Sequence, residues 1–193
     1  MMTKRGRPRD PAIQKSILAA SYDLLLKDGF KGVTMEKIAE QAGVSKVTVY
    51  KWWPNKAAVV MDGFLDAATD RLPVPDTGRV IDDIKIHASN LCRFMTGHEG
   101  KMIAALIGEG QEDKVLMEAI RSRYIQPRRM EAIEILRKGR ERKELREGAE
   151  LGLCVDLLYG PLLYRMLVTG EPLHEEFVRQ LVDSAFRGLM PPQ

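Results

Sequence analysis

Five side chains that can donate hydrogen bonds lie close together in the first third of the chain, namely Lys46, Thr48, Tyr50, Lys51 and Lys56. Ammonium and hydroxyl donors along one face suit a polyanion such as nucleic acid. Up to Lys56 the chain has 11 Lys and Arg against 5 Asp and Glu, whereas the remainder has 19 against 22. A basic front end joined to a mildly acidic body predicts that only the first part meets a polyanion.

The segment from residue 33 to residue 56 has the pattern of a helix-turn-helix. Two helices that cross steeply over a short turn need a small residue where they touch, and Ala39 supplies it. Gly43 can end the first helix in a left-handed conformation, and Ser45 can cap the second. The remaining inward positions are occupied by Ile38, Ala42, Val44 and Val49.

Residues for catalysis or metal binding are scattered. His87, His98 and His174 lack metal-ligand spacing, and the chain has neither paired cysteines nor a glycine-rich phosphate loop. We therefore expect no enzyme activity, no catalytic residue, no metal and no cofactor. Cys92 and Cys154 each lie in an apolar helical pattern, which favours two reduced core thiols over a disulfide or a redox switch.

Composition indicates a globular protein. Of 193 residues, 45% are hydrophobic and 30% are charged. No apolar run approaches the roughly 18 residues of a membrane span, and no apolar signal-peptide core follows the basic N-terminus. These features predict a cytoplasmic protein without a membrane partner.

Residues 1–9 form a basic arm that we predict to be flexible, because like charges interleaved with Gly and Pro cannot pack. The run Arg5-Gly6-Arg7-Pro8 is typical of an extended hook whose arginines enter the minor groove of DNA. A merely solvated tail is the alternative for Arg5 and Arg7.

The first domain is predicted over residues 10–72. Asp10 and Pro11 suit an N-cap and a first helical residue. Apolar periodicity and capping residues predict three helices of a helix-turn-helix domain and a fourth that follows them, over residues 11–29, 34–43, 45–53 and 55–72. Pro73 and Pro75 then mark a linker and the domain boundary.

These residues resemble the DNA-binding domain of the TetR family of bacterial transcription regulators. The resemblance covers roughly residues 10–60 almost without a gap. Beyond residue 75 it extends to the helical character, the length and the segment 158–165. The motifs that carry it in the first domain are Asp28-Gly29-Phe30-Lys31-Gly32-Val33-Thr34-Met35, Ile38-Ala39-Glu40-Gln41-Ala42-Gly43-Val44-Ser45, Thr48-Val49-Tyr50 and Asn55-Lys56.

The resemblance implies that the third helix lies in the major groove of double-stranded DNA, which admits one α-helix. Lys46, Val47 and Thr48 would then face base edges at the N-terminal end of that helix. The Thr48 hydroxyl can donate or accept, and Val47 suits a thymine methyl group.

The resemblance also implies contacts with the DNA backbone. Tyr50 and Lys56 match positions that typically contact phosphates. Thr34 can add its hydroxyl and the N-terminal amides of the second helix. Lys51, one helical step from Val47, would reach a phosphate or a guanine.

Trp52-Trp53 departs from the family pattern, which usually has a polar or aromatic residue followed by Phe. Trp53 lies four residues after Val49 and is expected to fill the core position. For Trp52 two interpretations stay open: its indole N–H serves a phosphate, or it packs against the first helix.

The second domain, residues 73–193, is predicted as five helices over residues 77–96, 100–110, 112–138, 150–168 and 173–189. The third should be kinked or interrupted at Pro127. Basic residues crowd its end and the following loop, but glutamates are interleaved with them. We therefore favour a salt-bridged surface over a second nucleic-acid patch.

In the family the last two long helices pair with their copies as a four-helix bundle, which predicts a homodimer. Two recognition helices would then lie about one DNA turn apart, roughly 34 Å or somewhat more, on a palindromic operator. The dimerisation residues implied are Leu163, Phe177, Leu181, Val182 and Phe186.

Family members also bind small effectors among the helices of the second domain. An effector here is expected to be hydrophobic, since the candidate pocket residues are mostly adaptable and apolar, with two phenols. An ordinary core role is the alternative for each of them, and it is the commoner role for such residues. They are Met95, Met102, Leu106, Tyr124, Leu158, Tyr159 and Leu162.

The sequence thus predicts an all-α, homodimeric transcriptional repressor that a small molecule releases from its operator. Alternatives are an effector-independent regulator or activator of the same fold, and a helical small-molecule carrier or enzyme that does not bind DNA. The donors around the third helix favour DNA binding, since a vestigial motif would have no reason to keep them.

Overall fold

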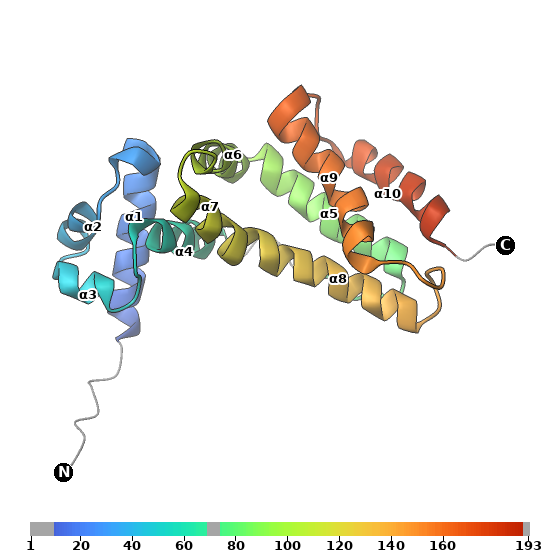
Figure 1. Cartoon of the computed structure of the whole chain (residues 1–193), viewed down its shortest axis with the longest axis horizontal. Coiled ribbons are helices and arrows are strands. Elements are labelled where there is room, and N and C mark those ends of the chain that lie inside the picture. The colour runs from blue at the N-terminus through green and yellow to red at the C-terminus, as the bar shows by residue number, and fades with distance from the viewer. Residues whose placement is uncertain (1–9, 69–73, 191–193) are drawn as a thin grey trace, which may run out of the picture. The chain divides into compact units, whose positions relative to one another are not determined.

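The computed structural model describes residues 10–68 and 74–190, and every regular element in these ranges is a helix (Figure 1). The predicted all-α class is therefore confirmed. The chain divides into two compact units, Met1–Thr69 and Asp70–Gln193.

The first unit contains α1 (Pro11–Gly32), α2 (Met35–Gln41), α3 (Lys46–Tyr50) and α4 (Lys56–Ala68). Asp10 caps α1 by accepting a hydrogen bond from the Ala12 N–H at 3.0 Å. Gly29 has a φ of 66°, so the regular helix stops at the predicted glycine and one further turn follows. The α3 helix is shorter than the predicted 45–53.

Close contact between α1 and α4 holds the first unit together, and Gly63 is where it occurs. A Cβ on Gly63 would lie 2.2 Å from Ser21 Oγ and 2.7 Å from the Leu18 carbonyl oxygen. Ser21 is fully buried, and its hydroxyl donates to the Leu18 carbonyl at 2.8 Å. Only a residue without a side chain allows the two helices to approach this closely.

The second unit is built around α5 (Val80–Thr96), against which four other helices pack (Figure 1). The remaining elements in chain order are α6 (His98–Gly110), α7 (Lys114–Ile120), the π-helical turn η2 (Arg121–Ile125), α8 (Gln126–Glu141), α9 (Leu151–Tyr164), the π-helical turn η3 (Arg165–Thr169) and α10 (Glu175–Leu189).

The long helix predicted over residues 112–138 is interrupted just before Pro127 rather than at it. The Gln126 N–H bonds to the carbonyl of Arg121, five residues earlier, which makes η2 a π-helical turn. Proline has no N–H with which to continue the regular ladder. Such turns insert one extra residue and change which side chains share a face.

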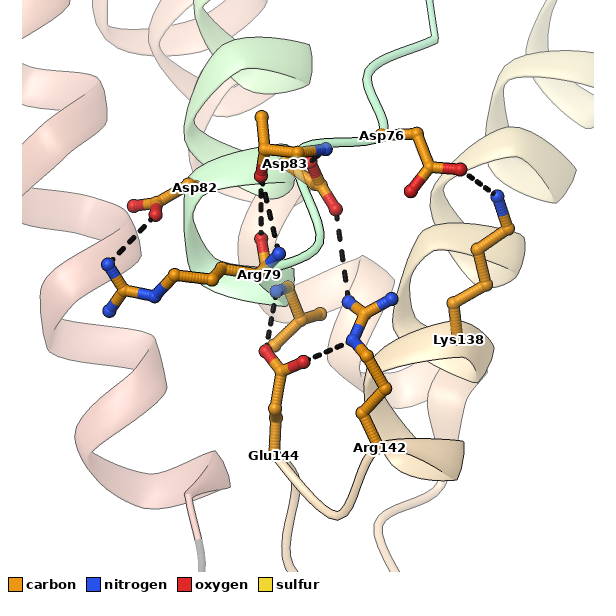
Figure 2. Close-up of polar contacts among 9 residues, drawn as sticks. Asp76, Arg79, Asp82, Asp83, Lys138, Arg142 and Glu144 are labelled. Atoms are coloured by element: carbon orange, nitrogen blue, oxygen red, sulfur yellow. Dashed lines mark hydrogen bonds and ion pairs between the residues drawn. The ribbon is translucent and has the colours of Figure 1, made fainter.

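The start of α5 is capped by a residue far along the chain. Its N-cap, Arg79, makes no side-chain cap bond, but Glu144 accepts from the Val80 N–H at 2.6 Å. Figure 2 shows Arg142 on the same Glu144 carboxylate and directed toward Asp83, at 3.9 Å. These contacts hold the first turn of α5 to the loop that follows α8.

Replacing Glu144 with alanine is expected to lower the free energy of unfolding of the second unit by about 1–2 kcal/mol, because the Val80 N–H loses its acceptor. Urea denaturation followed by circular dichroism measures this. Glu147 is exposed, so Glu147→Ala is the matched control. Equal stability of the two variants would contradict the capping role.

The charged end of α8 forms ion pairs within the second unit. Arg137 pairs with Glu134 at 2.6 Å and with Glu141, and Lys138 pairs with Asp76 at 2.7 Å. Such pairing favours the predicted salt-bridged surface over a second nucleic-acid patch.

Candidate functional site

The α2–α3 turn has the geometry that positions a short exposed helix. Gly43 adopts a φ of 68°, and the Val44 N–H bonds to the Ala39 carbonyl at 2.9 Å. Ser45 then caps α3, its hydroxyl oxygen accepting from the Thr48 N–H at 3.1 Å. The direction of α3 is therefore set by a few local bonds.

One residue of α3 points inward and the rest point outward. Val49 is fully buried, whereas Val47 is 66% exposed and Tyr50 is 47% exposed. Lys46 is exposed and Thr48 is half-buried. A solvent-facing valine beside hydroxyl and ammonium groups matches the mixture of apolar and hydrogen-bonding groups in a major groove.

Lys46 is paired with Glu36 of α2 on the protein surface. The hydrogen bond from Lys46 lowers the pKa of the Glu36 carboxyl, and the same bond raises the pKa of the Lys46 ammonium. Both side chains are exposed, so the pair contributes little to stability. Lys46 uses one of its three N–H donors on Glu36 and can offer the others to DNA, but the carboxylate partly compensates its charge.

Lys56 occupies a more structural position than the sequence suggests. Its ammonium donates to the carbonyls of Phe30 and Val33 at 3.0 and 3.2 Å and lies 4.3 Å from the centre of the Phe30 ring. Two of its three N–H groups are thus used to hold the end of α1. A phosphate contact through the third stays a prediction.

The other predicted DNA contacts flank α3. Thr34 caps α2, accepting from the Lys37 N–H at 3.2 Å, and its hydroxyl donates to the Glu36 carboxylate. Its contact with DNA stays a prediction. Lys51 is exposed at the end of α3. Arg5 and Arg7 lie outside the described residues.

Both tryptophans are placed by the structure. Trp53 is buried, as expected of a core residue, and its indole N–H donates to Asp62 at 2.7 Å. Trp52 is half-buried, and its ring stacks on that of Trp53 with centroids 5.8 Å apart.

A cavity of about 580 Å³ lies among the helices of the second unit. Of the predicted pocket residues, Met95, Tyr124 and Tyr159 line it. Leu106, Leu158 and Leu162 are buried in the core without lining it, and half-buried Met102 does not line it either. Those four assignments are corrected, because the helices present the next residue in each case to the cavity, namely Ile103, Ile107, Tyr159 and Leu163.

The cavity has a buried polar wall that sequence reasoning missed. His87 Nδ1 lies 2.8 Å from the Tyr159 hydroxyl, and His87 Nε2 lies 3.5 Å from Glu131. Both His87 and Tyr159 are more than nine-tenths buried. Ile84 and Leu91 lie on the inner face of α5, and helical spacing places position 87 on the same face. This spacing is the sequence signal that could have identified His87 as an inward residue.

Electrostatics define the hydrogen-bond directions in this wall. Burial opposes the charge on Glu131, but hydrogen bonds from His87 and Arg128 outweigh it and lower the pKa of the carboxyl. An ionised Glu131 only accepts, so His87 Nε2 is the donor in that contact. Burial raises the pKa of Tyr159, which keeps this phenol protonated.

Two of the predicted dimerisation residues are corrected. Val182 is fully buried and Phe186 is 1% exposed, because this face of α10 packs inside the chain's own core. Phe177 and Leu181 are half-buried, and Leu163 lines the cavity while remaining 38% exposed.

The continuous helix Leu151–Thr169, formed by α9 and η3, is long and apolar enough to cross a membrane by length and composition alone. This differs from the expectation that no apolar run approaches that length, because the helix tolerates charged residues within the span. Asp156 pairs with Arg129 of α8. A single helix of this kind is weak evidence for a membrane span, and α9 packs against α5, α8 and α10 within the second unit.

Among the described residues, no three His, Cys, Asp or Glu side chains are grouped so as to hold a metal ion. Cys92 and Cys154 are both buried free thiols.

Comparisons with known proteins agree with these features. Residues 17–61 match the family model of bacterial regulatory proteins of the tetR family, and residues 74–185 match the tetracyclin repressor-like C-terminal domain. The regulator YdeS of Bacillus subtilis, an uncharacterized HTH-type transcriptional regulator, is 56% identical over 98% of this chain and 96% of its own.

Two further relatives cover nearly all of the chain. The DNA-binding transcriptional repressor TetR of Mycobacteroides abscessus is 30% identical over 99% of this chain and 98% of its own. The crystal structure of the TetR family regulator SCO0332 is 37% identical, with a TM-score of 0.78, and covers 93% of this chain and 99% of its own. The chain therefore belongs to the TetR family of helix-turn-helix transcriptional regulators, which bind DNA.

Proposed function

We propose that this regulator is a cytoplasmic homodimeric repressor that binds a palindromic operator through α3 and leaves it when a small molecule occupies the cavity of the second unit. The observation that carries the proposal is that cavity, whose volume of about 580 Å³ lies in the range of small-molecule sites. The exposed donors of α3 support the DNA-binding half of the proposal.

The test is selection of preferred sites from random duplex DNA by the purified chain, with its mass measured in solution. We expect the selected DNA site to be palindromic and to be bound by a dimer. That site then serves as the operator in release assays. No enrichment above background at low salt would overturn the proposal.

An exposed apolar face of α9 and η3 supports the dimer. Leu153, Leu157, Tyr164 and Val168 recur at helical spacing and are 52–69% exposed. A continuous apolar face of this kind is typical of an interface, and a two-fold axis lets one patch cover its own copy. Half-buried Phe177 and Leu181 of α10 extend the candidate surface.

Leu157→Glu is expected to convert the dimer to a monomer, because each interface would bury two unpaired carboxylates. Sedimentation equilibrium measures the mass. Val115 of α7 is similarly exposed, at 54%, so Val115→Glu is a control that should stay dimeric. A full dimer in Leu157→Glu would place the interface elsewhere.

Glu36→Gln is expected to raise the affinity for DNA by up to about fivefold, because the charge of Lys46 is no longer compensated by a carboxylate and one negative charge near the phosphates is gone. Fluorescence anisotropy with the selected operator measures the change. Glu40→Gln removes an exposed carboxylate of the same helix and is the control. A larger gain in the control would show a general charge effect only.

A further inference from the structure

The cavity of the second unit is bordered by three arginines that differ in their partners. Arg128 pairs with Glu131 at 2.8 Å, and Arg129 pairs with Asp156. Arg121 is exposed at the cavity, and no carboxylate of the described residues pairs with it. The charged groups around the cavity therefore leave a net positive charge, located at Arg121.

The buried polar groups of the cavity need no ligand to satisfy them. Buried Tyr159 and His87 bond to each other, and His87 Nε2 lies 3.5 Å from half-buried Glu131, which accepts from Arg128. Buried Asn90, which also lines the cavity, accepts from Arg93. A ligand that displaced one of these bonds would leave a buried polar group unpaired, which is costly. The buried wall thus stays intact, and Arg121 is the group left to recognise a ligand.

The rest of the cavity wall is mainly apolar and adaptable. Met95, Met117 and Met166 contribute flexible thioethers, and Ile103 and Ile107 contribute branched side chains. Methionine side chains adjust to apolar bodies of different shape. The interior therefore favours a hydrophobic body without selecting a single outline.

Arg121 borders the same wall as residues one and two turns later along η2 and α8. Residues 121, 124, 125, 128 and 129 all border the cavity, and their i, i+3, i+4, i+7, i+8 spacing is that of one helix face. The π-helical turn η2 lies in this stretch, and π-helical turns are frequent at functional sites.

We propose that the cavity binds amphipathic anions, an inference that rests on the ligand-released function proposed above. The apolar body lies among the methionines and isoleucines, and a carboxylate or similar anionic head bonds to the Arg121 guanidinium. Because Arg121 is exposed, the head group keeps part of its hydration and avoids the cost of full burial. A neutral head gains less from Arg121, and an ammonium head is repelled.

Three probes with one apolar body test this proposal: 2-naphthoate, 2-naphthol and 2-naphthylmethylammonium. Their affinities for the full chain are measured by calorimetry at neutral pH without DNA. We expect the carboxylate to bind about tenfold more tightly than the neutral alcohol, and the ammonium to bind most weakly.

Arg121→Gln should abolish the preference for naphthoate over naphthol while leaving the naphthol affinity unchanged. Arg140→Gln removes the same charge from an exposed position on α8 outside the cavity wall, and should keep the preference. The proposal is overturned if naphthol binds as tightly as naphthoate, if none of the probes binds, or if Arg121→Gln keeps the preference.

Release from the selected operator is then measured separately with the same probes. Naphthoate that binds through Arg121 but does not release DNA would overturn the ligand-released repressor and leave the ligand class standing. Release by naphthol and naphthoate at equal concentrations would overturn the ligand class and leave the repressor standing.

Discussion

The double variant Lys46→Ala, Thr48→Ala is expected to lose at least about thirtyfold in affinity for the selected operator, because each good base contact discriminates by about 1–3 kcal/mol. Affinity for a scrambled duplex should fall much less, since phosphate contacts are independent of sequence. Fluorescence anisotropy with both duplexes at one salt concentration measures the specificity ratio.

This double variant should remain folded. Ser45 keeps its cap bond to the backbone N–H of residue 48, and Val49 keeps its place in the core. Lys27→Ala removes one exposed cation of α1 and controls for the loss of charge. If the double variant still chose the same operator over the scrambled duplex, α3 would not be the recognition helix.

Gly63→Ala is expected to destabilise the first unit by about 3 kcal/mol, because the added methyl group meets Ser21 Oγ and the Leu18 carbonyl well inside contact distance. Neither neighbour can move easily, since one is a fully buried side chain and the other belongs to the helix backbone. Specific DNA binding should be lost at temperatures where the second unit is still folded.

Thermal unfolding followed by circular dichroism measures this effect, and operator binding is measured across the same temperatures. Gly108 lies in α6 with open space where its Cβ would be, so Gly108→Ala should be neutral or slightly stabilising. Similar melting curves for the two variants would show that α1 and α4 do not need a glycine where they meet.

Local features of the first unit could be predicted from sequence. Asp10 and Ser45 are caps, Gly43 is the left-handed turn residue, and Val49 is the inward residue of α3. Each of these depends on residues within about one helical turn, so spacing and residue type are sufficient. The family resemblance has the same basis and is confirmed by the matches in both units.

Long-range contacts explain where sequence reasoning failed. A wide apolar stripe identified α10 as amphipathic but did not show that Val182 and Phe186 face the protein's own core. The phosphate contact of Lys56 stays a prediction, but the sequence did not show that its ammonium also holds the backbone carbonyls of residues 30 and 33. His87 was one of three scattered histidines until folding brought it to Tyr159, 72 residues away.

The sequence by itself determined the helical class, the helix-turn-helix and the outward donors of α3, because these follow from periodicity and capping along a short stretch of chain. Only the tertiary structure decided which apolar faces are covered and where a cavity remains. It also left Arg121 as the uncompensated charge at that cavity. The physical reason is that burial and charge compensation depend on which distant helices pack together, and a helical stripe specifies a face without specifying its partner.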